Sequence, residues 1–181
     1  MSDRPPSAAA ATPRHPPAWF DAQYNNRARI PEHLQILAEW ADRSAAARAT
    51  QPATLDIAYG RDPAERLDLF PTATPQAPGL VYIHGGYWRA LDKSDASFIA
   101  PPFVAAGAMV AVTNYALCPA ASVEEIVRQQ RAALAWVWRH AAAHGGDPER
   151  IVVAGRPGEG GARALRRVRA RAAAPRAFPR H

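Results

Sequence analysis

One stretch decides the fold of this chain: Val81-Tyr82-Ile83-His84-Gly85-Gly86-Tyr87-Trp88. Its apolar first part is short and ends before a pair of glycines, which predicts a buried strand. The two glycines allow the backbone to turn sharply and to come close to a ligand. We therefore expect a core strand that leads into a loop with a binding or catalytic role.

Four further segments extend this strand into a sheet. Continuous apolar runs at 108–112 and 151–154 are typical of strands that are buried on both faces of a parallel sheet. Segments 54–60 and 66–70 alternate polar and apolar residues, so we expect a pair of half-buried neighbouring strands there.

Helical segments alternate with these strands. Apolar residues recur at helical spacing in 32–43 and from Ser122 onward, where Ser122 and Glu125 fit a capping box. Gly145 stops the second helix, and 147–150 predicts a turn into the last strand. Strands that alternate with helices indicate a mostly parallel sheet, whose sites lie beyond the carboxyl ends of the strands.

Length and composition exclude several classes of protein. A chain of 181 residues with 48% hydrophobic residues can form one domain with a sizeable core. No apolar run approaches the roughly 18 residues of a membrane span. The first residues lack the basic start and apolar region of a secretory signal. Cys118 is the single cysteine, which excludes an internal disulfide and fits a reducing, cytoplasmic location.

The net charge of +6 lies entirely at one end of the chain. Residues 1–155 hold 14 Lys and Arg against 15 Asp and Glu, whereas 156–181 hold 8 Arg and one acidic residue. Because the first 155 residues are almost neutral, we expect neither nucleic acid nor a membrane as the partner of the folded part. The number of subunits is left open.

Several short motifs follow one another in an order that resembles the kynurenine formamidase (arylformamidase) and carboxylesterase branch of the α/β-hydrolases. The resemblance covers roughly residues 20 to 155. The matching motifs are Tyr24-Asn25-Asn26-Arg27, Tyr59-Gly60, Leu67-Asp68, His84-Gly85-Gly86-Tyr87-Trp88, Leu91-Asp92-Lys93-Ser94, Asn114-Tyr115, Cys118-Pro119 and Gly145-Gly146-Asp147-Pro148.

The resemblance implies a fold and a set of site residues. The fold is an incomplete α/β-hydrolase three-layer sandwich, α/β in class, with helices on both faces of a mostly parallel sheet. Gly85 and Gly86 would belong to the oxyanion hole, together with the backbone N–H of Tyr87. His84, Tyr87 and Trp88 would border the substrate pocket, with His84 holding the loop by hydrogen bonds. Such enzymes need no metal or other cofactor.

Members of this branch cleave a carboxylic ester or an N-formyl amide of an aromatic amine with a Ser-Asp-His triad. The serine lies in a Gly-x-Ser-x-Gly elbow after a strand. Here Gly155 is followed by Arg156 and then Pro157, which occupies the serine position and has no nucleophilic atom. No Asp occurs after Asp147, and the only later histidine is His181. We therefore expect this chain to hold no catalytic triad and to be inactive.

The composition after Gly155 allows two hypotheses. Residues 156–181 consist mainly of Arg, Ala, Gly and Pro, as a shifted reading frame of a GC-rich gene would encode. The nucleotide sequence tests this, because one of the other two frames must then encode an elbow and an apolar-patterned continuation. The alternative is a non-catalytic pseudoenzyme whose basic tail binds RNA or anionic surfaces.

The sequence therefore divides into three regions: a disordered Pro- and Ala-rich lead-in (1–18), the N-terminal part of a hydrolase domain (19–155) and an aberrant or disordered tail (156–181).

Overall fold

The computed structural model describes residues 15–155 and 166–167. The lead-in up to residue 14 and the elbow position at Pro157 lie outside these ranges. Both hypotheses on the tail therefore fall almost wholly on residues that the structure does not describe.

The chain forms two compact units, Met1–Leu34 and Gln35–His181. In the first unit, α1 (Pro17–Tyr24) is followed by the single turn of α2 (Asn26–Arg29). The side chain of Asn25 caps α2 by accepting a hydrogen bond of 3.2 Å from the amide of Ala28. The matching motif Tyr24–Arg27 is thus a helix junction.

The second unit is built on a six-stranded sheet with the order β1-β2-β4-β3-β5-β6. Its strands are β1 (Thr54–Ala58), β2 (Arg66–Phe70), β3 (Ala77–Ile83), β4 (Met109–Thr113), β5 (Gly146–Gly155) and β6 (Arg166–Arg167). The β3 strand lies between β4 and β5 and is parallel to both, whereas β1–β2, β2–β4 and β5–β6 are antiparallel pairs. The sheet is mixed, and β1, β3, β4 and β5 run in one direction.

The predicted pair of strands at 54–60 and 66–70 is confirmed, but its predicted half-burial is wrong: β1 is exposed apart from the half-buried Ile57, and β2 is more buried than expected. Residues 67–70 are all buried, including Asp68, which is fully inaccessible. The reason is that β2 lies inside the sheet, between β1 and β4, with helices over both faces. The alternation of polar and apolar residues in this strand is therefore due to a buried carboxylate, that of Asp68, and not to a face that is exposed to solvent.

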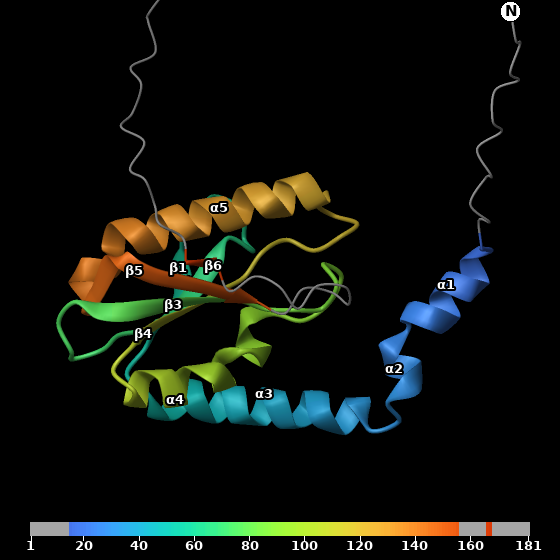
Figure 1. Cartoon of the computed structure of the whole chain (residues 1–181), viewed down its shortest axis with the longest axis horizontal. Coiled ribbons are helices and arrows are strands. Elements are labelled where there is room, and N and C mark those ends of the chain that lie inside the picture. Colours follow the sequence, from blue (N-terminus) through green and yellow to red (C-terminus); the bar gives the residue numbers. More distant parts are fainter. Residues whose placement is uncertain (1–14, 156–165, 168–181) are drawn as a thin grey trace, which may run out of the picture. The chain divides into compact units, whose positions relative to one another are not determined.

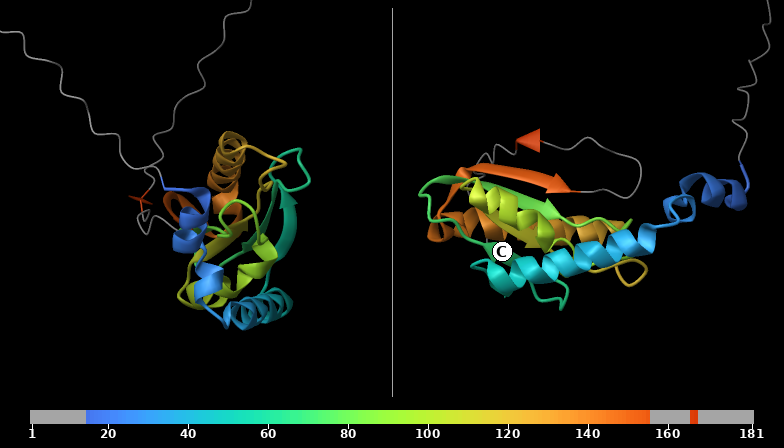
Figure 2. Two further views of the ribbon diagram at one scale, coloured as in Figure 1. Left: turned by 90° about the vertical axis from the view of Figure 1, so that its right-hand side faces the viewer. Right: turned by 90° about the horizontal axis from the view of Figure 1, so that it is seen from below.

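Helices cover both faces of the sheet (Figure 1), as the three-layer prediction requires. The long helix α5 (Val123–His140) lies over one face. On the other face, α3 (His33–Thr50) and α4 (Ala100–Ala105) lie side by side, as Figure 2 shows. Short 3-10 helices complete these layers: η1 (Lys93–Asp95), η2 (Ser97–Ile99) and η3 (Ala141–His144).

Each face of the sheet has its own apolar core. One cluster joins Leu67, Val81 and Met109 to Val137 of α5. The other packs the opposite faces of the strands, including Val110, against the segment before α4. Burial of these side chains at roughly 25 cal/mol per Å² of apolar surface is the main force that holds the layers together.

The local signals around α5 agree with the structure only in part. The predicted capping box is half formed, because the carboxylate of Glu125 accepts from Arg128 and Gln129 instead of returning to Ser122. Ser122 caps the helix by accepting a hydrogen bond from the amide of Glu125 at 3.2 Å, and Gly145 adopts a left-handed conformation after it. Residues 147–150 do not form a separate turn, because β5 begins at Gly146 and runs through them. Within the part of the chain that the structure describes, no helix is long and apolar enough to cross a membrane.

Candidate active site

The loop after β3 and the loop after β4 meet at the carboxyl edge of the sheet. This is the edge at which ligands bind in open α/β sheets. The amide of Cys118 donates a hydrogen bond of 2.7 Å to the carbonyl of Trp88, and this bond ties the two loops together. The sequence-predicted site residues Gly85, Gly86 and Tyr87 lie in the first of these loops.

The backbone from Gly86 to Trp88 is left-handed. The φ angles are +111° at Gly86, +55° at Tyr87 and +59° at Trp88. A hydrogen bond of 3.0 Å from the amide of Arg89 to the carbonyl of Gly86 closes the turn. Positive φ at two bulky aromatic residues costs on the order of 1–3 kcal/mol each, and such strain is typical of functional loops that the surroundings hold in place.

The carbonyl and amide groups of this loop are used in different ways. The carbonyls of His84, Gly86 and Trp88 accept hydrogen bonds from Tyr115, Arg89 and Cys118 respectively. In the described part of the chain, the amides of residues 85–88 donate no hydrogen bond. A run of successive amides without partners is the arrangement that binds anions in backbone nests. The loop can therefore offer several N–H donors to one developing negative charge.

His84 lies beneath this loop and is only 2% exposed. Its Nε2 lies 2.9 Å from Oδ1 of Asn114, and its Nδ1 lies 2.8 Å from the carbonyl oxygen of Gly85. Burial lowers the pKa of His84 below its ordinary value, although hydrogen bonds to Gly85 and Asn114 act in the opposite direction. Both ring nitrogens face loop or core atoms, so His84 holds the loop.

Asn114 connects most of the polar groups at this edge. Its Nδ2 donates to Asp92 at 2.7 Å, which leaves its Oδ1 to accept from His84. In this orientation, Nε2 of His84 can donate to Oδ1 of Asn114. The carbonyl of Asn114 accepts from the hydroxyl of Tyr59 at 2.5 Å and from the amide of Gln130 at 3.0 Å. One residue thus joins the hairpin, both loops and α5.

A buried ion pair supports the same loop from the side of β2. The Nζ of Lys93 lies 2.7 Å from Oδ1 of Asp68 and 2.7 Å from Oδ1 of Asp56. The side chains of Lys93 and Asp68 are 8% and 0% exposed, whereas Asp56 is largely exposed. Burial alone would lower the pKa of Lys93, but the hydrogen bonds and charges of the two carboxylates outweigh it and raise the pKa.

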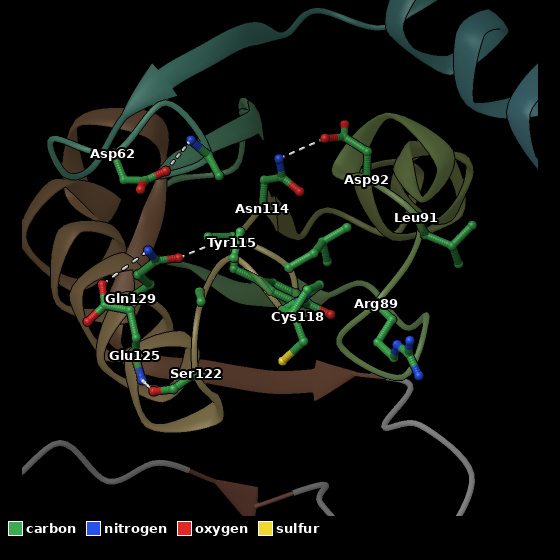
Figure 3. Close-up of a pocket in the computed structure, with 16 residues that line it drawn as sticks. Asp62, Arg89, Leu91, Asp92, Asn114, Tyr115, Cys118, Ser122, Glu125 and Gln129 are labelled. Carbon is green, nitrogen blue, oxygen red and sulfur yellow. Dashed lines mark hydrogen bonds between the residues drawn. The ribbon is translucent and has the colours of Figure 1, made fainter.

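A cleft of about 750 Å³ opens beside the loops. Figure 3 shows polar side chains around it, among them Asp62, Asp92 and Glu125, with the sulfur of Cys118 between them. Its walls come from the β1–β2 turn, both loops and the start of α5. A cleft of this size at the carboxyl ends of strands is large enough for a small organic substrate.

None of the predicted site residues, oxyanion or pocket, lines this cleft, whose nearest lining residue in the loop is Arg89. His84 is buried, and neither Tyr87 nor Trp88 lines the cleft. The rings of Tyr87 and Trp88 lie side by side, 5.4 Å apart, and are 52% and 37% exposed. That these three residues border a substrate pocket stays a prediction.

No nucleophile with a base lies in the described part of the chain. Among residues 15–155, no serine, threonine or cysteine side chain is hydrogen-bonded to a histidine ring. The hydroxyl of Ser97 is buried and donates to the carbonyl of Lys93, and Ser122 caps α5. Groups of three or more His, Cys, Asp or Glu that could hold a metal are also absent from the described residues.

Sequence reasoning missed the roles of Asn114, Tyr115 and the pair of Lys93 with Asp68. Asn114 and Tyr115 follow a buried strand directly, and this position at the carboxyl edge is a usable signal. The Lys93–Asp68 pair carries no local signal, because its members are 25 residues apart and Asp68 alternates with apolar neighbours.

A family model described as BD-FAE matches residues 67–165, which are more than half of the chain. The chain belongs to the BD-FAE family. It is an α/β-hydrolase of the formamidase and esterase branch, in agreement with the resemblance of its motifs. The match covers β2 to β5 and thus both loops of the candidate active site.

Curated relatives of this BD-FAE chain are hydrolases. The kynurenine formamidase of Danio rerio is 33% identical over 104 residues, which are 56% of this chain and 34% of that protein. The carboxylesterase NlhH of Mycobacterium tuberculosis is 40% identical over 87 residues, 47% of this chain and 27% of that protein. The chain spans about a third of the length of the curated relatives it matches.

Solved structures show the same architecture. A protein from Silicibacter sp. TM1040, provisionally assigned as a thioesterase, is 33% identical with a TM-score of 0.66. The similarity covers 76% of this chain and 51% of that one. Esterase B of Lactobacillus rhamnosis, at 21% identity and a TM-score of 0.54, covers 70% of this chain and 45% of that chain, and shows the fold alone.

The strained turn gives a first prediction. In Gly86→Ala, the new Cβ would lie 1.9 Å from the carbonyl oxygen of Ala90 at a φ of +111°. We expect the loop to be displaced and the free energy of unfolding to fall by at least about 1–3 kcal/mol, measured by denaturant titration. The matched control is Gly107→Ala, which also has positive φ but whose nearest neighbour is 3.4 Å away. Equal losses in both variants would contradict a steric role for Ala90.

The buried ion pair gives a second prediction. Lys93→Met leaves the Asp68 carboxylate buried and unpaired, so we expect a loss of about 3–5 kcal/mol in the free energy of unfolding. Arg43→Met, which removes the exposed pair with Glu39, is the control and is expected to cost at most about 1 kcal/mol.

The same pair predicts a dependence on pH. Because the folded pKa of Lys93 is raised above 10.5, its contribution is fully present below that value and is lost as the pH rises through the folded pKa. Denaturant titrations between pH 8 and alkaline conditions measure this loss. The loss should be smaller in Lys93→Met, where the raised pKa of Tyr115 still lowers stability at high pH, and an equal alkaline loss in that variant would contradict the role of Lys93.

Proposed function

We propose that this chain carries the oxyanion-binding half of a hydrolase that cleaves a small carboxylic ester or an N-formyl amide of an aromatic amine. The observation that carries the proposal is the loop Gly85–Trp88, which is left-handed from Gly86 to Trp88. Its carbonyls at Gly86 and Trp88 accept hydrogen bonds, while its successive amides have no partner in the described residues. The names of the relatives, kynurenine formamidase and carboxylesterase, support the two substrate classes.

In this proposal the loop acts on the tetrahedral intermediate. When a nucleophile attacks the carbonyl carbon, the amides of Gly85, Gly86 and Tyr87 donate to the oxygen as it becomes negative. Removing one such donor from an acyl-transfer enzyme costs about 10²–10³ in kcat. Because the turn is preorganised, its donors need not rearrange at the moment of reaction. This is the functional reason for the backbone strain at Tyr87 and Trp88. Their exposed rings border the acyl or aryl group.

The chain as written lacks the other half of this chemistry. A serine hydrolase needs a hydroxyl whose proton an imidazole accepts, and a carboxylate that orients the imidazole. Pro157, which has no nucleophilic atom, stands at the serine position. Proline also lacks the backbone N–H and restricts φ to about −65°, which suits a strained elbow poorly. We therefore propose that this chain forms no acyl-enzyme.

A fluorophosphonate probe tests the proposed inactivity. We expect the purified chain to show no covalent adduct by intact-mass spectrometry, because the probe needs an activated serine. A serine hydrolase of known activity, treated in parallel, is the control for the reagent. An adduct on Ser94, Ser97, Ser122 or any other serine, abolished by its Ser→Ala variant, would overturn the proposal.

A further inference from the structure

We propose that Tyr115 is a positioning residue, whose hydroxyl fixes the direction of the peptide groups that open the Gly85–Tyr87 loop. The inference adds a residue role to the proposed function. It rests on that proposal because the direction of these amides matters for catalysis only if they bind the oxyanion. Tyr115 also lines the cleft beside the loops, but in this proposal it acts through the loop and not on the reacting atoms.

Both the ring and the hydroxyl of Tyr115 contact the start of the loop. It directly follows Asn114 at the end of β4 and is 3% exposed. Its ring stacks on the ring of His84, with the centroids 4.3 Å apart and the planes 5° apart. Its hydroxyl lies 3.0 Å from the carbonyl oxygen of His84 and 3.5 Å from that of Gly85.

Because the peptide group is planar, these contacts also fix the directions of two amide N–H bonds. In a trans peptide the C=O and the following N–H lie in one plane and point in opposite directions. A donor that holds the carbonyl of His84 therefore directs the amide of Gly85 away from Tyr115. The weaker contact with the carbonyl of Gly85 does the same for the amide of Gly86.

The remaining anchors of the loop come from the main chain. The carbonyls of Gly86 and Trp88 are held by the amides of Arg89 and Cys118. At the start of the loop, the carbonyl of His84 is held by a side chain, the hydroxyl of Tyr115. Burial raises the pKa of Tyr115 to about 12, so its hydroxyl keeps its proton at neutral pH.

The chain offers a closely matched pair of variants. Tyr115→Phe removes one oxygen and keeps the ring that stacks on His84. Tyr59→Phe also removes a hydroxyl that donates to a backbone carbonyl, that of Asn114, but this hydroxyl does not contact the loop. Both variants lose one hydrogen bond, so we expect similar losses of roughly 2–6 °C in Tm.

Residual dipolar couplings of backbone amides distinguish the two roles, because they report the direction of each N–H. We expect the couplings of Gly85 and Gly86 to change in Tyr115→Phe by more than those of residues 80–83, and to change clearly less in Tyr59→Phe. Unchanged couplings in Tyr115→Phe, or equal changes in both variants, would overturn the proposal. So would order parameters below about 0.6 for these two amides in the unsubstituted chain, which mean that nothing fixes them.

Butylphosphonate, a tetrahedral anion, separates this inference from the proposed function. We expect it to shift the amide resonances of Gly86 and Tyr87, and to bind Tyr115→Phe about three- to tenfold more weakly than the unsubstituted chain. Absence of any shift in the unsubstituted chain would count against the oxyanion role, while the couplings would still decide the role of Tyr115. Shifts with equal affinity in both proteins would overturn the positioning role.

Discussion

The planar peptide group is the constraint on which this edge of the molecule depends. A loop can present successive N–H groups on one side only if its carbonyls are satisfied on the other side. Here the donors for those carbonyls come from the loop itself, from the segment after β4 and from the hydroxyl of Tyr115. The strained φ angles at Tyr87 and Trp88 persist because these bonds hold them.

The motifs that resemble the formamidase branch turn out to be physically connected. Tyr59, Asp92 and His84 all bond to Asn114, and Asp68 bonds to Lys93, the residue after Asp92. Residues that are far apart in the chain are therefore members of one buried polar network. A partly satisfied network in a low dielectric would be costly, so its members depend on one another. This explains why ordinary turn sequences are specific when they occur together.

Much of the fold could be predicted from local patterns. The apolar run at 108–112 lies in a strand that is buried on both faces and needs no polar alternation. The runs at 80–83 and 151–154 are strands too, although residues 152–154 are only half-buried. The helix after Ser122 could be predicted because its cap and its apolar face are both local. The burial of Asp68 could not, since its partner Lys93 is distant in sequence. The loop's place at the carboxyl edge followed from topology, but the left-handed turn depends on contacts that only the folded chain supplies.

The carbonyl of Asn114 accepts one hydrogen bond from the β1–β2 hairpin and one from α5, through Tyr59 and Gln130. The loop therefore cannot be regarded as a portable motif of five residues. An engineer who transplants His84–Trp88 into another scaffold has to bring the end of β4, the tyrosine of the hairpin and a glutamine from the helix as well. The functional unit is therefore the hydrogen-bonded network, and the motif His84–Trp88 is only one part of it.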